Sequence, residues 1–120
     1  MSLDVCLSLR YHVSYDGGKT LEEKEDCVYD SNITHNLGKM ADKAGIYFVL
    51  WRPEEVGKTK AKDIIKQLEK GLSKLKNRPD YFEKFNSPNG WGMYEHFVPF
   101  VEEYLEACKK YPDAKIVVSR

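Results

Sequence analysis

A regular alternation of apolar and polar residues over the first fifteen positions constrains the fold of this chain most strongly. Successive side chains of a β-strand point to opposite faces, so a period of two predicts a strand with one buried face. This pattern predicts a long, half-buried strand over Leu3–Tyr15. Its apolar positions are Leu3, Val5, Leu7, Leu9, Tyr11, Val13 and Tyr15.

The next residues predict a turn and a second strand. Asp16-Gly17-Gly18 supplies residues that tolerate the positive φ angles of a tight turn. The polar residues 19–25 indicate a solvated hairpin arm or loop. A shorter second strand is expected at Asp26–Asp30, with Cys27 and Tyr29 facing inward.

The three cysteines are spread along the chain without metal-ligand spacing. Cys6 falls on the polar face of the first strand, so we expect no Cys6–Cys27 disulfide. Together with Cys108, both are expected to be reduced thiols.

Three longer segments have the apolar spacing of amphipathic helices. We expect helices at Thr34–Ala44, Thr59–Lys76 and Tyr94–Lys110. The apolar positions of the second are Ala61, Ile64, Ile65, Leu68, Leu72 and Leu75. Asn32 or Thr34 is expected to cap the first helix, which ends at Gly45, and Thr59 to cap the second.

Shorter elements lie between these helices. Ile46–Trp51 is an apolar run that we interpret as a short helix, and Asp80–Phe85 as one more helical turn. Asn86–Gly92 is a loop rich in helix breakers. Pro99 either kinks the last helix or falls in its first turn, with the helix then starting near His96. Lys115–Ser119 predicts a last strand.

The order of these elements predicts an α+β fold. We expect a small, mainly antiparallel sheet of two N-terminal strands and one C-terminal strand, with three to four helices on one face. No repeat or linker divides the chain, and 120 residues suit one domain spanning 1–120.

Charge and hydropathy exclude some classes of partner. Lys plus Arg and Asp plus Glu both number 19, so the chain lacks the basic surplus of a general nucleic-acid binder. A local basic patch is compatible with the cluster of Lys58, Lys60, Lys62 and Lys66. No segment reaches the ~20 apolar residues that cross a bilayer, and no signal peptide is evident. We therefore expect no membrane partner and a cytoplasmic location, that of a bacterial host if the protein is phage-derived.

Few features of the sequence favour an enzyme. The three histidines, His12, His35 and His96, show no metal-ligand spacing. The tripeptide Gly57-Lys58-Thr59 resembles the tail of a phosphate-binding loop, but Arg52 stands where that motif requires its first glycine. We expect no metal and no cofactor.

The stretch NITHN is the first candidate site. Asn32, Thr34, His35 and Asn36 gather where a strand meets a helix. They either cap the helix, or they bind an anionic group at its N-terminus, where free N–H groups and the helix dipole favour negative charge.

The stretch NGWG is the second candidate site. Two glycines flank Trp91, so its indole is free to stack on a planar ring, although a tight turn with a buried tryptophan has the same pattern. His96 follows and adds a polar group. Arg52 is a weaker candidate, which binds an anion or packs on an aromatic face.

The chain resembles a family of small, uncharacterised single-domain proteins of bacteriophages and bacterial genomes. Four stretches carry the resemblance: NITHNLGKMADKAGIY, LWRPEE, NGWGMYEHFVPFVEEYLEAC and YPDAKIVVSR. It covers most of the chain and is weakest over residues 17–26 and around Lys58. The resemblance implies a shared site at Asn32, Thr34, His35, Asn36, Trp51, Arg52, Gly90, Trp91 and Gly92, without identifying a ligand.

These features favour non-catalytic binding of a small anionic, nucleotide-like ligand. By analogy, a phage protein of this kind would sequester a host signalling nucleotide. One alternative is an enzyme that acts on such a molecule with His35 as general base. Another is a protein-interaction or inhibitor module that uses the aromatic surface. The sequence leaves open a site formed across a homodimer.

Overall fold

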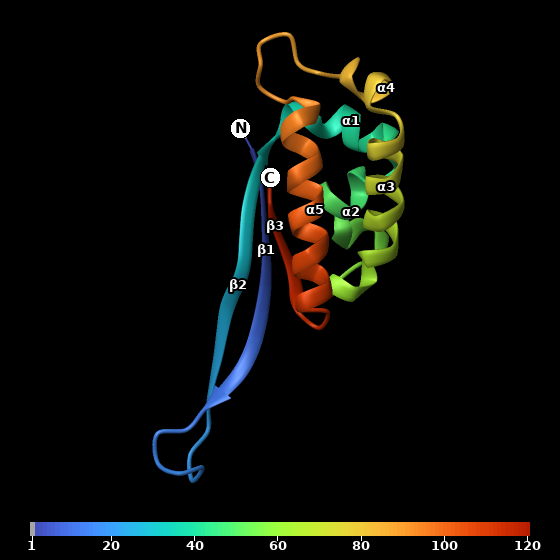
Figure 1. Cartoon of the computed structure of the whole chain (residues 1–120). Helices are drawn as coiled ribbons and strands as arrows, with labels where there is room; N and C mark the ends of the chain where they lie inside the picture. The colour runs from blue at the N-terminus through green and yellow to red at the C-terminus, as the bar shows by residue number, and fades with distance from the viewer. Residues whose placement is uncertain (1) are drawn as a thin grey trace.

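The computed structural model describes residues 2–120 and has one sheet with helices on one side (Figure 1). The sheet is antiparallel, in the order β2-β1-β3. Its strands are β1 (Ser2–Val13), β2 (Glu22–Thr34) and β3 (Lys115–Ser119). The helices are α1 (Gly38–Lys43), α2 (Tyr47–Trp51), α3 (Ile65–Asn77), α4 (Pro79–Glu83) and α5 (Tyr94–Lys110), and 3-10 turns span His35–Leu37, Pro53–Val56 and Ala61–Asp63. The predicted α+β fold is confirmed.

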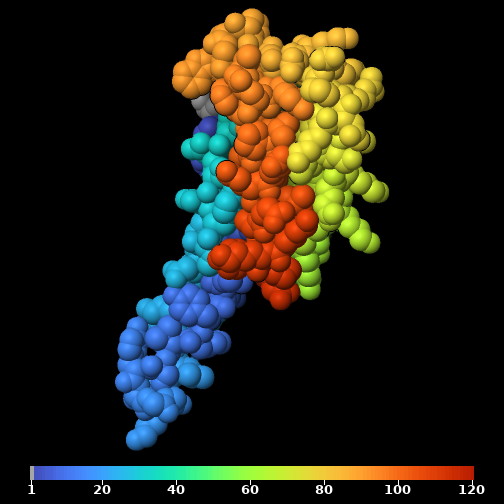
Figure 2. All heavy atoms as spheres, viewed as in Figure 1, coloured from blue at the N-terminus to red at the C-terminus, as the bar shows by residue number. Residues whose placement is uncertain are grey.

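The alternation in β1 marks the buried face only where helices cover the sheet. Leu3, Val5 and Leu7 are fully or almost fully buried, whereas Tyr11 is 42% and Tyr15 81% exposed. β3 pairs with β1 only from Asp4 to Ser8. Beyond that point β1 and β2 continue as a two-stranded arm that protrudes from the body (Figure 2). The strand ends at Val13, two residues before its predicted end.

β2 differs most from the sequence-based expectation. It spans thirteen residues, from Glu22 to Thr34, and not only the five that were predicted. The outer half of β2 is exposed and lacks apolar alternation. Hydrogen bonds to β1, and not burial of side chains, hold this half in the sheet. Of the two alternatives for residues 19–25, a solvated hairpin arm or a loop, the arm applies to residues 22–25, which pair with β1.

A β-bulge corrects two predictions about the cysteines. The register passes from Leu7 opposite Tyr29 to Ser8 opposite Cys27, so Val28 is an extra residue. The bulge moves Cys27 from the inner face, where it was expected, to an exposed position on the face that carries Ser8.

Cys6 then becomes a diagonal neighbour of Cys27 on that face. The two form a disulfide with a Cα–Cα distance of 5.9 Å, contrary to the prediction of reduced thiols. Disulfides persist mainly in oxidising compartments, so the cytoplasmic location stays a prediction. Cys108 is free and buried, and burial raises its pKa to about 12.

The core lies between the sheet and the helices. α5 contributes several of its fully buried side chains, and α3 packs against α5. The expected short helix at residues 46–51 is confirmed as α2. α5 begins at Tyr94, so Pro99 is its sixth residue and does not belong to a helix that starts at His96. Pro99 is exposed, so the carbonyl that loses its N–H partner lies close to solvent.

The structure shows which residues cap the two helix starts for which caps were predicted. Thr34 is the cap before the 3-10 turn, because its Oγ1 accepts from the Asn36 N–H at 3.3 Å, and Asn32 remains inside β2. Thr59 is not a cap. The carboxylate of Asp63 accepts from the N–H groups of Thr59 and Lys60 at 3.1 and 3.0 Å. Within residues 2–120, no helix combines the length and apolarity needed to traverse a bilayer.

Candidate functional site

The two candidate motifs come together in one open groove of about 820 Å³. Figure 1 shows the loop before α5 next to the end of β2, where the chain enters α1. The groove is lined by Asn32, Ile33, Thr34, His35, Asn36 and Leu37 of the first motif, by Asn89, Gly90, Trp91 and Gly92 of the second, and by Ser2 and His96.

Direct contacts hold the two motifs against each other. Asn36 donates from Nδ2 to the Trp91 carbonyl at 2.8 Å, across a separation of 55 residues. Gly92 has φ +115°, and a Cβ there would lie 2.9 Å from Asn36 Cβ and 3.4 Å from Thr34 Cγ2. Glycine is therefore required at this position both for its backbone conformation and for the close approach.

The backbone of Trp91 is fixed on both sides, while its indole is free. Asn89 Oδ1 accepts from the Trp91 N–H at 3.0 Å and from the Ser87 hydroxyl at 2.6 Å. The Trp91 side chain is 70% exposed, in contrast to 3% for Trp51. Over residues 2–120, no aromatic ring stacks on Trp91. A large aromatic face is thus held open to solvent at the groove.

His35 is oriented by Trp51. The indole Nε1–H of Trp51 donates to His35 Nδ1 at 2.8 Å. A neutral imidazole that accepts at Nδ1 carries its proton on Nε2. His35 is half-buried and lines the groove, so it supplies an N–H donor there.

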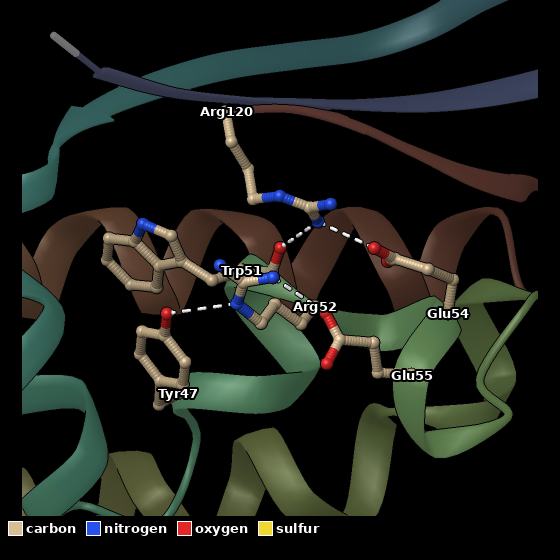
Figure 3. Close-up of polar contacts among 6 residues, drawn as sticks. All are labelled: Tyr47, Trp51, Arg52, Glu54, Glu55 and Arg120. Carbon is tan, nitrogen blue, oxygen red and sulfur yellow. Dashed lines mark hydrogen bonds and ion pairs between the residues drawn. The ribbon is translucent and has the colours of Figure 1, made fainter.

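Trp51 is in turn held firmly. Its ring stacks on Tyr47 with centroids 5.4 Å apart and planes at 9°. Its carbonyl accepts from Arg120 Nη1 at 2.7 Å, and the same nitrogen lies 2.6 Å from Glu54 Oε1 (Figure 3). The hydrogen bond from Arg120 lowers the pKa of the Glu54 carboxyl. These contacts connect the C-terminal residue to the side chain that orients His35.

Arg52, the weaker candidate, does not reach the groove. Its guanidinium donates to Glu55 Oε2 at 2.7 Å and to the Tyr47 hydroxyl at 3.3 Å (Figure 3). Both contacts, that with Glu55 more strongly, raise the pKa of Arg52 above its ordinary value. Arg52 is therefore part of the support beneath Trp51, and the structure does not place it with the other site residues.

The groove is neutral and suits hydrogen bonding more than ion pairing. Among its described lining residues are two histidines and several amides, and no Lys, Arg, Asp or Glu. Asn36 and Asn89 are occupied by Trp91, whereas the amide of Asn32 is exposed. His96 is exposed, with Nε2 4.0 Å from Glu95 Oε1. Over residues 2–120, no three His, Cys, Asp or Glu side chains gather to hold a metal ion.

Six of the seven predicted site residues thus line one groove: Asn32, Thr34, His35, Asn36, Trp91 and His96. Asn89 and Ser2 were missed. An Asn before Gly is a common turn signal, so the sequence contained a signal from which the role of Asn89 in holding the loop could have been predicted. Ser2 reaches the groove only because β1 pairs with the end of β2, which a local pattern does not reveal.

Comparisons with protein-family models, with curated proteins and with solved structures found no match to this chain. The resemblance to a phage and bacterial family therefore stays a prediction. The residues of the groove are the basis for a functional inference.

Proposed function

We propose that the groove binds a small nucleotide-like molecule without converting it, with the base stacked on Trp91. The observation that carries this proposal is the exposure of Trp91. The residue is 70% exposed, while Asn36 and Asn89 hold its backbone through hydrogen bonds. Because the backbone is already fixed, binding orders only the side chain of Trp91, which limits the entropic cost. Stacking of a base on an aromatic side chain is worth about 1–3 kcal/mol.

Neutral donors would hold the polar part of the ligand. The Nε2–H of His35 and the amide of Asn32 offer hydrogen bonds to a phosphate, carboxylate or carbonyl oxygen. The volume of about 820 Å³ is within the range of small-molecule sites, about 300–1,000 Å³. Because Arg52 is engaged elsewhere, the affinity is expected to depend only weakly on salt.

A protein that binds such a ligand and leaves it unchanged acts by sequestration. Combined with the resemblance to phage proteins, this supports the proposal that the ligand is a host signalling nucleotide and that the protein has an anti-defence role. Both motifs of the groove come from the same chain, so we expect one ligand per chain.

Catalysis by His35 is less well supported. Its Nδ1 lone pair accepts from Trp51, and the other nitrogen of the neutral ring carries the proton. No lone pair is then available to remove a proton from a substrate, as a general base must. The exposed indole favours a second alternative, a protein-interaction surface.

Time-resolved native mass spectrometry with a panel of nucleotides separates these functions. The proposal predicts a one-to-one complex whose ligand mass does not change, and loss of that complex in Trp91→Ala. A ligand that changes mass would indicate an enzyme. If no member of the panel binds, the interaction module becomes the better description.

A further inference from the structure

A second hollow, of about 410 Å³, lies where α1 ends and α3 passes over it. It is lined by Lys58, Lys66, Lys70 and Lys74, together with Ala44, Gly45, Asp63 and Gln67. It shares no lining residue with the groove. Part of the lysine cluster expected from the sequence is therefore here, and the hollow adds two lysines from further along α3.

The four lysines converge from two segments. Lys66, Lys70 and Lys74 follow each other at four-residue intervals on one face of α3, which places them about 6 Å apart along the helix. Lys58 comes from the loop after Gly57 and is half-buried. Gly45 leaves room for the end of Lys74, whose Nζ would lie 3.6 Å from a Cβ at that position. The four lysines thus line one hollow, three from a single face of α3 and one from the loop before it.

The four lysines form no close ion pairs with carboxylates among residues 2–120. Within residues 2–120, none of the four Nζ atoms lies within 4.0 Å of a carboxylate oxygen. Nearby lysines differ, because Lys62 pairs with Asp113 and Lys76 with Glu102.

The carboxylate of Asp63, which lines the hollow, forms hydrogen bonds with the backbone. Asp63 accepts hydrogen bonds from the N–H groups of Lys60 and Thr59, which lower its pKa, and the nearby charge of Lys58 lowers it further to a smaller extent. Like charges spaced four residues apart destabilise a helix, so helix stability does not account for the lysine row. The local excess of positive charge occurs in a chain whose net charge is zero.

We propose that this hollow binds a compact polyphosphate anion, a small molecule with two or more linked phosphates. Lysine binds phosphate as a point charge, and several ammonium groups around one small space match several linked phosphates. A nucleic-acid strand requires a longer basic track than one hollow provides. The site does not depend on the proposed function of the groove.

Isothermal titration calorimetry with sodium tripolyphosphate tests this site directly. At about 50 mM salt, where screening is moderate, we expect one ion to bind per chain, and binding to weaken steeply as salt is added. Lys70→Gln should weaken binding by about two- to fivefold, the factor that corresponds to one exposed ion pair. Lys70→Gln combined with Lys66→Gln and Lys74→Gln should abolish it.

Lys19→Gln is the matched control, because it removes the same charge from the exposed turn of the arm. It should bind like the wild-type chain, and Lys70→Arg should retain most of the affinity. Equal binding by Lys70→Gln and Lys19→Gln, or no binding of tripolyphosphate, would overturn the proposal. Tighter binding of a single-stranded oligonucleotide than of tripolyphosphate would also contradict it. Displacement of tripolyphosphate by a nucleoside triphosphate would show that the hollow also accepts the phosphate chain of a nucleotide. Lack of displacement would restrict the site to free polyphosphate.

Discussion

At the scale of single residues, the groove depends on how two side chains are held. Trp91 is held through its backbone by Asn36 and Asn89, which leaves the indole free. His35 is held through its ring by the indole N–H of Trp51, which leaves one N–H for a ligand. Each arrangement makes a prediction that does not require the ligand to be known.

The tautomer of His35 is the first of these predictions. Nitrogen-15 NMR above neutral pH should show His35 as the Nε2–H tautomer, because Nδ1 accepts from Trp51. Trp51→Phe keeps an aromatic ring but removes the donor, so His35 should then populate both tautomers. The exposed His96, which has no indole donor, is the internal control. A wild-type His35 that already populates both tautomers would show that the hydrogen bond does not form.

The second prediction concerns the contact between the two motifs. Gly92→Ala should lower the free energy of unfolding by about 1–3 kcal/mol, since the new Cβ meets Asn36 and the φ angle is unfavourable. Gly90→Ala is the control, because Gly90 has φ +78° but open space around it. Urea titration should show the larger loss for Gly92→Ala, and equal losses would remove the evidence for tight contact.

At the scale of secondary structure, α3 packs against the chain between α1 and α2. A Cβ on Gly71 would overlap Ile46 Cγ2, so Gly71→Ala should cost about 1–3 kcal/mol despite the better helix propensity of alanine. Gly38→Ala is the control, because its new Cβ would lie 3.6 Å from Tyr47, which is an ordinary contact. This substitution should stabilise the protein by about 0.4–1 kcal/mol. Thermal melts that rank the two variants in the opposite order would contradict this packing.

The 3-10 turn that precedes α3 gives a prediction about pH. Hydrogen bonds from the N–H groups of Lys60 and Thr59 lower the pKa of Asp63 from its usual 3.8. The stabilisation is therefore complete above about pH 4 and is lost as the pH falls through the lower native pKa. Asp63→Ala should cost about 0.5–2 kcal/mol at pH 7, and its difference from wild type should shrink below pH 4. Glu69→Ala, an exposed position on α3, should show no such convergence.

Sequence patterns predicted these elements where burial governs them. The alternation in β1 and the apolar spacing in α3 both mark core positions, with Leu68 fully buried and Ile65 half-buried. β2 was predicted too short because hydrogen bonds to β1, which leave no periodic pattern, hold its exposed half. The bulge at Val28 likewise has no local signature, so the disulfide of Cys6 was missed.

For the candidate site, the sequence indicated residues but not their arrangement in space. NITHN and NGWG were each recognisable as polar or aromatic loop residues, but their contact depends on the tertiary fold. Arg52 does not line the groove, and an arginine after a tryptophan does not reveal that Glu55, three residues on, and Tyr47 will bind it. Trp51 appeared as a motif residue, and only the structure assigns its N–H to His35.

At the scale of the whole molecule, the arm and the groove lie at opposite ends of the first two strands. Ser2 pairs with Thr34 beside the groove, and Val13 pairs with Glu22 where the arm ends. The molecule measures 59 × 27 × 24 Å, and its radius of gyration of 16.5 Å exceeds the about 13–14 Å of a compact chain of this length. Substitutions in the arm (Figure 2) are therefore suitable controls for ligand binding, since they are remote from the groove.

The central claim is that one groove, built by NITHN and NGWG, binds a nucleotide-like ligand through Trp91 and His35. Isothermal titration calorimetry, with the nucleotide that native mass spectrometry identifies, tests this most directly. Trp91→Ala should weaken binding by roughly tenfold or more, in line with the loss of ~1–3 kcal/mol of stacking, and His35→Ala should also weaken it. Trp91→Ala should melt at the wild-type temperature. His35→Ala should still fold but lose about 1–3 kcal/mol of stability, because the buried N–H of Trp51 is left without its acceptor. Thr34→Ala should instead lower stability by about 1 kcal/mol through loss of the cap. Unchanged affinity in Trp91→Ala and His35→Ala would contradict the claim.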